Sequence, residues 1–449
     1  MANNFDYDVV VIGAGPGGLA AAYTLSSSKK VLVIENNLWG GTCPNFGCDP
    51  KKMLYSVVES KRQANQYDEN GLRGTSEVSV DWPSMIKFKQ SYTDKIPGGT
   101  ESGLASSNID HVYGTAQFID QHTVLVDNNK YQSKQFIIAT GAKPSIPEIP
   151  GAELFDTSTE FLAMPSKPDS IGIVGAGYVA IEIANIAIES GIKVDIFQHN
   201  DRILSGFPAE FTGKLAELLE KKGVTFHWNS SVSQLQGTPD GSITLSTNDQ
   251  QTYTFNHVFA AVGRGANIES LHLDKAGVQS NHGGVIVNQY QQSTANNIFA
   301  IGDAVSKSIP KLTPVASYEG RYVADFILER KTDPIIFPAI PHTVFAGPEL
   351  SQVGVTLNEA KDDPQKYQIK NQSVGSWYSY HRVLDDSAQI ATITDGEQGT
   401  LVGAVVLSSN AEELINYFTE MINDRKGAKN LPDQIPVYPS AASDLSYLM

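Results

Sequence analysis

One local pattern, which occurs twice in this 449-residue chain, restricts the possible folds more than any other feature. At its first occurrence the apolar segment 9–12 runs into the glycine-rich turn 13–18 and then into an Ala- and Leu-rich segment, 19–25. A second apolar segment, 31–34, ends in Glu35. Strand, glycine turn, helix and second strand with a terminal acid form a βαβ unit that binds a dinucleotide. The glycines let the backbone approach a pyrophosphate, the start of the helix supplies amide donors, and the acid can bind ribose hydroxyls.

The second occurrence begins at the apolar segment 171–174, followed by the turn 175–180 and a predicted helix over 181–190. A further strand is expected at 193–197. The last position of this turn is Ala180, a variant that the pattern allows where helix and strand pack closely. Two such units predict two bound dinucleotides.

The chain contains only two cysteines, Cys43 and Cys48, which lie five positions apart between a predicted strand and a predicted helix. A disulfide across so short a loop removes little chain entropy and therefore adds little stability. A zinc site would need more ligands than this segment offers. We therefore favour a disulfide that forms and breaks during turnover over two inert buried thiols or a metal site, and we expect no bound metal.

The cysteine pair and the two nucleotide units together indicate which cofactors the chain uses. A pair of thiols cannot itself accept a hydride from a nicotinamide, whereas a flavin can accept two electrons and reduce a disulfide. The residues therefore predict both FAD and NAD(P)H.

Charge and composition limit the partners of the chain. The formal net charge of −16 argues against nucleic acid and anionic membranes. No basic leader precedes the first strand and no apolar run reaches about 18 residues, so neither a signal peptide nor a membrane span is expected. With two cysteines and no export signal, the sequence predicts a cytoplasmic protein.

The pattern of expected strands and helices changes after about residue 331. Alternating strands are expected at 389–394 and 401–407, a helix at 411–422, and no nucleotide motif follows. We predict an α/β fold with two Rossmann-like three-layer nucleotide-binding domains and a C-terminal α+β dimerisation domain. The predicted boundaries are 1–150 with 271–330 for the FAD domain, 151–270 for the NAD(P) domain and 331–449 for the C-terminal domain.

Several motifs together resemble one known family along nearly the whole chain. The most specific runs from Gly40-Gly41-Thr42-Cys43 to Lys52, and it is accompanied by Gly13–Glu35, Gly114-Thr115-Ala116, Ala139-Thr140-Gly141, Gly175–Glu182, Thr294–Asp303 and Leu312–Ala316. The chain resembles the flavin-dependent class I pyridine nucleotide–disulfide oxidoreductases, a family that includes glutathione reductase, dihydrolipoamide dehydrogenase and mercuric reductase.

The resemblance implies a role for each matching position. Cys48 would be the thiolate in contact with the flavin, and Cys43 the outer thiol that attacks the substrate. Lys51 and Glu182 would pair near the reactive edge of the flavin, and Tyr178 would cover the nicotinamide pocket. The implied FAD residues are Gly13, Gly15, Pro16, Gly17, Gly18, Glu35, Gly41, Thr42, Lys52, Ala116, Thr140, Gly141, Asp303 and Thr313, and the implied NAD(P) residues are Gly175, Gly177, Tyr178, Val179, Gln198, His199 and Gly263. The family also implies a homodimer in which the C-terminal domain completes the active site of the partner.

Two positions depart from the family pattern. The family's C-terminal motif His-Pro-Thr-x-x-Glu is replaced here by the segment 438–443, in which Tyr438 takes the place of the histidine and Asp444 follows. A phenol, with a reference pKa of about 10, is a poor base at neutral pH, and loss of an acid–base group costs about 10²- to 10⁴-fold in rate. We therefore predict weak turnover of ordinary disulfides, with Tyr438 as the candidate proton-transfer residue and Asp444 as the alternative. Asp49 replaces an apolar residue and, if it points inward, should disfavour a thiolate at Cys48.

The identities of the nicotinamide and of the electron acceptor remain open at this point. Gln198 can bind a ribose hydroxyl and His199 is a weak phosphate clamp, which favours NADH while allowing use of both cofactors. The favoured acceptor is a small disulfide, as in glutathione reductase. The alternatives are a metal ion, a quinone or oxygen, or a redox sensor with low turnover, and the chain lacks the additional C-terminal cysteine pair of mercuric reductase.

Overall fold

The computed structural model describes residues 5–449, which form two compact units. The first comprises the chain up to Lys51 with Lys87–Ser145 and Gly263–Ile336, and the second comprises Lys52–Ile86, Ile146–Val262 and Phe337–Met449. Two of the five passages of the chain between the units lie within helices α3 (Cys48–Gln66) and α4 (Trp82–Thr93). This division separates two units rather than three domains, so the three predicted boundaries stay predictions.

The first unit is built on a sheet with the strand order β3-β2-β1-β6-β5-β4, in which β18 also pairs with β6. Strands β1, β2, β3, β6 and β18 run parallel, whereas β4, β5 and β6 pair antiparallel. Its elements are β1 (Tyr7–Ile12), α1 (Pro16–Leu25), β2 (Val31–Glu35), α2 (Thr42–Phe46), α5 (Ile96–Ser106), β3 (Asp110–Tyr113), β4 (Gln117–Asp120), β5 (Thr123–Val126), β6 (Asn129–Ile138), β7 (Ala142–Pro144), β15 (Arg264–Ala266), β16 (Ser280–Asn281), β17 (Gly284–Val285), β18 (Ile298–Ala300) and α9 (Thr313–Ile327).

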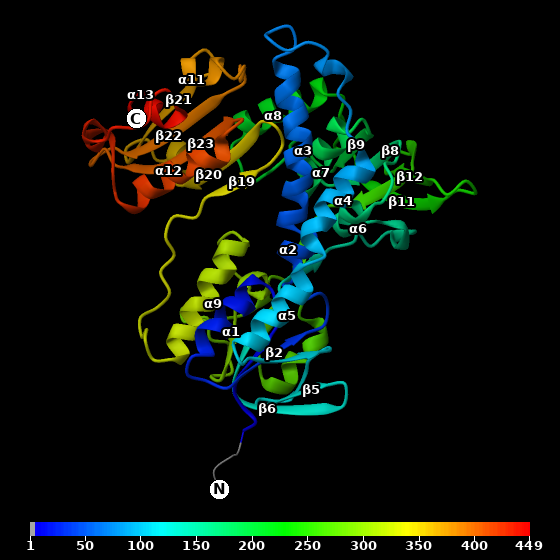
Figure 1. The fold of residues 1–449 in the computed structure, drawn as a ribbon, viewed down its shortest axis with the longest axis vertical. Helices are drawn as coiled ribbons and strands as arrows, with labels where there is room; N and C mark the ends of the chain where they lie inside the picture. Colours follow the sequence, from blue (N-terminus) through cyan, green and yellow to red (C-terminus); the bar gives the residue numbers. More distant parts are fainter. Residues whose placement is uncertain (1–4) are drawn as a thin grey trace. The chain divides into compact units, whose positions relative to one another are not determined.

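Strand β1 is buried on both faces, as a central strand of a three-layer domain should be. Val9 and Val11 belong to a core that helices α1, α5 and α9 cover, whereas Val10 and Ile12 face a second core that includes β4 and β5. Helices α1 and α9 lie side by side (Figure 1). Their approach requires glycine, because a Cβ on Gly320 would lie 2.3 Å from the carbonyl oxygen of Gly17. The first predicted nucleotide-binding fold is confirmed.

The second unit contains the other glycine-turn fold. Strands β10, β9, β8 and β14 form a parallel sheet in that order, and β11, β12 and β13 form a separate antiparallel one. The elements of this part are α6 (Ser158–Ala163), β8 (Ser170–Val174), α7 (Tyr178–Glu189), β9 (Lys193–Gln198), α8 (Ala209–Lys221), β10 (Thr225–Trp228), β11 (Val232–Gly237), β12 (Ile243–Thr247), β13 (Thr252–Phe255) and β14 (His257–Ala260).

The C-terminal part of the second unit is an antiparallel sheet with the order β19-β20-β23-β22-β21, and helix α12 packs against β20 and β23. The predicted α+β character of this region is confirmed. Its elements are β19 (His342–Val344), β20 (Glu349–Gly354), α10 (Leu357–Asp362), β21 (Tyr367–Ser373), α11 (Tyr378–His381), β22 (Gln389–Asp395), β23 (Leu401–Ser408), α12 (Ala411–Asn423) and α13 (Leu445–Leu448).

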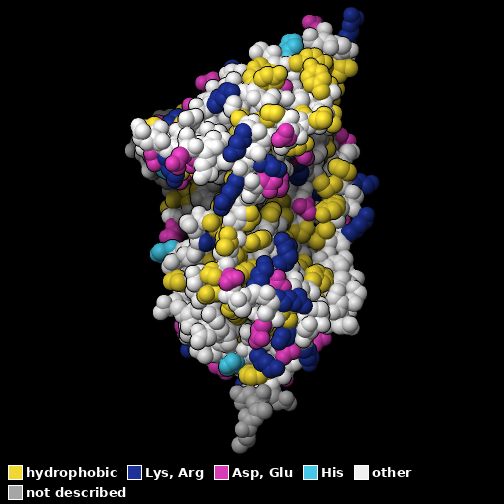
Figure 2. Space-filling model, turned by 90° about the vertical axis from the view of Figure 1, so that its left-hand side faces the viewer, with side chains coloured by type: hydrophobic (Ala, Val, Ile, Leu, Met, Phe, Trp, Pro, Cys, Tyr) yellow, Lys and Arg dark blue, Asp and Glu magenta, His cyan; other side chains and the backbone are white. Residues whose placement is uncertain are grey.

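Surface charge and helix length are the features of the structure that concern nucleic-acid and membrane partners. Figure 2 shows acidic and basic side chains interspersed over one face rather than a continuous basic patch. Every helix among residues 5–449 is too short or too polar to span a bilayer.

Candidate active site

The two cysteines lie on two successive helices, which corrects the prediction that they occupy a loop between a strand and a helix. Cys43 is on α2, and Cys48 is the first residue of α3. Gly41, with a φ of 73°, precedes α2, and the buried amide of Asn45 donates to the carbonyl of Gly41. A Cβ on Gly47 would lie 2.9 Å from the carbonyl oxygen of Thr42. Glycine at this position therefore lets the two helices follow each other closely enough to bring the thiols together.

The two thiols are free and interact with each other, but their acidities differ. The neighbouring Cys43 thiol, aided by the Thr313 hydroxyl 3.6 Å from the Cys48 sulfur and by the charge of Lys51, lowers the pKa of Cys48 to about 6. The interaction with Cys48 and burial raise the pKa of Cys43. Cys48 is therefore the more acidic thiol of the pair.

Asp49 points toward Cys43, a contact that the sequence did not predict. Its Oδ1 lies 3.9 Å from the Cys43 sulfur, and its Oδ2 accepts a 2.8 Å hydrogen bond from the hydroxyl of Tyr92. The charge of Asp49 raises the pKa of Cys48, as expected, but the bond from Cys43 outweighs it. Tyr92 could not have been found from the sequence, because it lies 43 positions from Asp49 and belongs to no motif.

The first glycine turn forms a cradle that matches the pyrophosphate of a dinucleotide. Gly13 has a φ of 109°, and a Cβ there would lie 2.3 Å from the carbonyl oxygen of Ala139. Gly15 precedes helix α1, which begins at Pro16 and whose first amides have no side-chain cap. Gly41 also packs closely against this turn, since a Cβ on it would lie 2.5 Å from the Cα of Gly15.

Glu35 ends β2 beside this cradle, where its carboxylate accepts backbone N–H bonds from Ala14, Asn36 and Asn37. These bonds orient the carboxylate at the position where the pattern places a ribose.

Other FAD residues implied by the resemblance also lie in the first unit. Thr140 carries a buried hydroxyl oxygen that has no hydrogen-bond partner among residues 5–449, as expected of a polar group that would bind a ligand. Gly141 follows with a φ of 69°, Ala116 is buried after β3, and Asp303 is half-buried after β18. Thr42 is exposed at the start of α2.

The sequence interpretation missed Arg264, which lies next to Gly263 on β15. Its guanidinium donates a 2.6 Å hydrogen bond to the carbonyl of Ala142. Burial lowers the pKa of Arg264, and the charges of Asp303 and Cys48 oppose that shift. Because its charge interacts with those of Asp303 and Cys48, Arg264 adds a positive charge to the predicted FAD cradle. The predicted NAD(P) residue Gly263 also lies in this first unit, and its role stays a prediction.

The second glycine turn repeats the cradle in the second unit. Gly175 has a φ of 102°, and Gly177 caps α7 without a side-chain bond. Tyr178 and Val179 open that helix, with the tyrosine ring 5.6 Å from the ring of Phe207 between centroids. Tyr178 is 37% exposed and therefore accessible to a ligand.

The two residues expected to choose between NADH and NADPH are Gln198, which ends β9, and His199, which follows it. Gln198 is buried, and its amide donates to Asn200 Oδ1 and to the carbonyl of Arg202. His199 is exposed. No acidic or arginine side chain occupies either position.

Two lysines at the start of α3 have different surroundings. Lys51 belongs to the first unit and Glu182 to the second, so the predicted pair between them stays a prediction. Glu182 is buried and accepts a 3.0 Å hydrogen bond from the backbone N–H of Phe345. Lys52, implied as an FAD residue, extends to Glu412 at 2.5 Å and lies 3.3 Å above the ring of Phe345.

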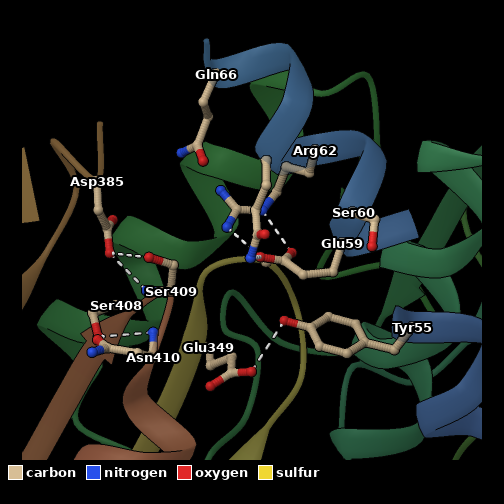
Figure 3. Close-up of polar contacts among 12 residues, drawn as sticks. Tyr55, Glu59, Ser60, Arg62, Gln66, Glu349, Asp385, Ser408, Ser409 and Asn410 are labelled. Carbon is tan, nitrogen blue, oxygen red and sulfur yellow. Dashed lines mark hydrogen bonds and ion pairs between the residues drawn. The ribbon is translucent and has the colours of Figure 1, made fainter. Parts of the chain in front are cut away.

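A polar network fixes the continuation of α3 in the second unit (Figure 3). The hydroxyl of Tyr55 donates to the buried carboxylate of Glu349, whose pKa burial raises to about 7. One turn further on, Arg62 binds Glu59 through two nitrogens. These contacts fix the part of α3 that belongs to the second unit.

Tyr438 lies in the C-terminal segment of the second unit and is 78% exposed. Asp444, at the end of the same segment, has a buried Oδ2 without a partner among residues 5–449. The role of either residue in proton transfer stays a prediction. Within the described residues, no three His, Cys, Asp or Glu side chains gather closely enough to hold a metal ion.

Comparison with known proteins gives a consistent result. Residues 7–320 match the family described as pyridine nucleotide-disulphide oxidoreductase, and residues 340–448 match its dimerisation domain. Glutathione reductase of Pisum sativum is 30% identical over 99% of this chain and 82% of its own length, and dihydrolipoyl dehydrogenase of Geobacillus stearothermophilus is 31% identical over 96% and 93%. The HOCl-induced flavoprotein disulfide reductase RclA from Escherichia coli superposes with a TM-score of 0.89 at 26% identity, covering 98% of this chain and 99% of that one. A mutant of RclA has also been solved as a Cu(II) complex.

Proposed function

The chain belongs to the pyridine nucleotide-disulphide oxidoreductase family, and from this premise we propose that it reduces a small disulfide with electrons from NAD(P)H. It is an FAD-dependent enzyme that uses NAD(P)H, as the members of this family are. The feature that supports the proposed acceptor is the pair of neighbouring free thiols, of which Cys48 is the more acidic and Cys43 the less acidic.

The residues of the first cradle would hold FAD. The turn 13–18 fits its pyrophosphate, Glu35 its ribose, and Thr140, Arg264 and Asp303 offer polar groups to the remainder. When bound, FAD supplies the two-electron redox chemistry that links a nicotinamide to a disulfide. The turn 175–180 in the second unit would hold NAD(P)H, with Tyr178 at its edge.

The chain's own thiols would then carry out the exchange with the substrate. Cys43 attacks one sulfur of the substrate disulfide and forms a mixed disulfide, while the first thiol product leaves. The thiolate of Cys48 next attacks the Cys43 sulfur, which restores the internal disulfide and releases the second thiol. Thr313 and Lys51 stabilise the thiolate of Cys48 until this step.

Reduction of a metal ion is the second candidate function. A mutant of RclA, which superposes on this chain, has been solved with Cu(II), and such an acceptor would not need the proton-transfer histidine that Tyr438 replaces here. The metal would be a substrate rather than a resident cofactor.

A turnover assay distinguishes the two candidates. With NADH and without oxygen, we expect the protein to reduce glutathione disulfide or bis(2-hydroxyethyl) disulfide slowly. Tyr438→His should raise disulfide turnover about tenfold, equivalent to about 1.4 kcal/mol of barrier, and should leave Cu(II) reduction unchanged.

Tyr447→His, which introduces histidine at another exposed tyrosine of the C-terminal segment, serves as the control. If neither the protein nor Tyr438→His reduces a disulfide while Cu(II) is reduced, the disulfide proposal is wrong and the metal-ion function replaces it.

We expect NADH to be preferred over NADPH. Neither Gln198 nor the exposed His199 gives a 2′-phosphate the bidentate partner that an arginine offers. His199→Arg should therefore shift the ratio of kcat/KM values about tenfold toward NADPH, and His199→Gln should leave it nearly unchanged. An unmodified protein that already favours NADPH would contradict this preference.

We further propose that the protein works as a homodimer through its C-terminal part, because residues 340–448 match the family's dimerisation domain. Several apolar side chains of this region are exposed in the single chain, as expected of a surface that a second copy covers. They are Tyr417, Ile435, Val437 and Tyr438.

A further inference from the structure

We propose that Asp49 accepts the proton of Cys43 and passes it to the departing thiolate, while Tyr92 holds the carboxylate in position. This inference rests on the disulfide reduction proposed above and names the group that moves the proton. Proton transfer, for which Tyr438 is the candidate on the family pattern, is thereby assigned to residues of the first unit.

The geometry is that of a nucleophile, a base and an orienting group. Asp49 is the second residue of α3, and its Oδ1 lies 3.9 Å from the sulfur of Cys43. Its other oxygen, Oδ2, accepts a 2.8 Å hydrogen bond from the hydroxyl of Tyr92 near the end of α4. A base that contacts the nucleophile and is itself held by a third group is the arrangement that activates a nucleophile. Asp49 is half-buried, so the carboxylate remains accessible to a substrate that reaches Cys43.

The charges around Cys43 make transfer of its proton to the neighbouring carboxylate less unfavourable than loss of that proton to solvent. If Cys43 lost its proton to solvent, its thiolate would lie 3.9 Å from the negative carboxylate of Asp49 and beside the thiolate of Cys48. Like charges at this distance repel strongly in a partly buried site. Transfer of the proton to Asp49 leaves one negative charge in the Cys43–Asp49 pair. Lys51 is the cationic group that acts on Cys48, and the bond to Asp49 raises the pKa of Tyr92, which keeps that tyrosine a donor.

The proton and electron balance of the step is complete. The thiol of Cys43 gives its proton to Asp49, and the resulting thiolate attacks one sulfur of the substrate disulfide. The substrate S–S bond breaks, a Cys43–substrate S–S bond forms, and the leaving thiolate takes the proton from Asp49. Cys48 then displaces the second thiolate, which is protonated by solvent. The two thiols of the protein lose two electrons and the substrate gains them.

The test compares two disulfides in single turnovers of the prereduced protein. An aliphatic disulfide, bis(2-hydroxyethyl) disulfide, releases a basic thiolate that needs a proton, whereas the aromatic 5,5′-dithiobis(2-nitrobenzoate) releases a thiolate that needs none at neutral pH. Asp49→Asn should slow exchange with the aliphatic disulfide about 10²-fold more than exchange with the aromatic one, because only the aliphatic leaving thiolate needs the proton that Asp49 returns. Tyr92→Phe, which frees one carboxylate oxygen, should slow the aliphatic reaction severalfold. Asp94→Asn makes the same change of charge near the end of α4 and should change neither rate.

A second measurement separates proton transfer from a structural role. Removal of the carboxylate charge should lower the pKa of Cys43 and therefore speed its alkylation by iodoacetamide at neutral pH, read by mass spectrometry. Faster alkylation together with slower aliphatic exchange supports the proposal. Equal slowing of both disulfides, or unchanged aliphatic exchange, overturns it.

The two proposals fail in different ways. If the unmodified protein does not turn over any aliphatic disulfide with NADH, the proposed function is wrong. The single-turnover comparison of the two disulfides still decides the role of Asp49, because it requires only the prereduced thiols.

Discussion

Cys48→Ser is expected to abolish disulfide reduction, lowering kcat by about 10⁴-fold or more, because the mixed disulfide on Cys43 can no longer be resolved. The pH dependence of the remaining thiol should change as well. Iodoacetamide labelling of the prereduced protein should reveal a Cys43 thiol that reacts only well above neutral pH, since burial and the nearby carboxylate disfavour its charged form.

Cys43→Ser provides the matched control. It should also stop turnover. The serine hydroxyl can still donate a hydrogen bond to Cys48, so the pKa of Cys48 should stay near its value of about 6 and its thiolate should persist at every higher pH. Labelling of Cys48 should then be fast above pH 6 and slow below it, because the depressed pKa keeps the reactive thiolate at every higher pH. Two single-cysteine proteins with the same labelling profile would contradict the unequal pair.

Gly18→Ala is the second substitution with a large expected effect, although it adds only one methyl group. A Cβ at this position would lie 2.0 Å from the carbonyl oxygen of Gly13, a contact between backbone segments that no side-chain movement relieves. We expect the turn and helix α1 to be forced apart at a cost of about 3 kcal/mol. Binding of FAD should weaken about 100-fold, measured by the flavin retained after gel filtration and by Tm.

A glycine of another helix in the same unit supplies the control for this substitution. Gly98 lies in α5, is exposed, and has no heavy atom within 4 Å of the position that its Cβ would take. Gly98→Ala should leave flavin content unchanged and should raise stability by about 0.5–1 kcal/mol, because alanine loses less backbone entropy in a helix. Loss of flavin in both variants would show that the close approach at Gly18 is not the cause.

The sequence predicted most reliably those parts of the site that depend on local chain geometry. Both glycine turns, their flanking strands and helices, and Glu35 follow from short segments whose spacing is itself the requirement. The thiol pair could also be predicted from the sequence. Its placement on two helices depends on the close approach of Gly47 to Thr42, which the spacing of the cysteines alone does not reveal.

The parts that could not be predicted arise from residues far apart in the chain. Tyr92 reaches Asp49 across 43 positions, and Thr313 reaches Cys48 across 265. Arg264, on the strand β15 that pairs with β7, interacts electrostatically with Asp303 and Cys48. None of these contacts leaves a periodic or spaced signature, so the charges that set the acidity of each thiol appear only in the folded structure.

The short separation between Cys43 on α2 and Cys48 at the start of α3 has a consequence for the energetics of electron transfer. Because the ring closed by a Cys43–Cys48 bond contains so few residues, opening it releases little chain entropy, and the couple can cycle without unfolding any part of the protein. Its reduction potential should therefore be governed by charge rather than by conformation. The low pKa of Cys48 stabilises the reduced form of the pair and therefore makes the disulfide a stronger oxidant toward its electron donor. This stabilisation weakens as the pH falls, because Cys48 becomes protonated.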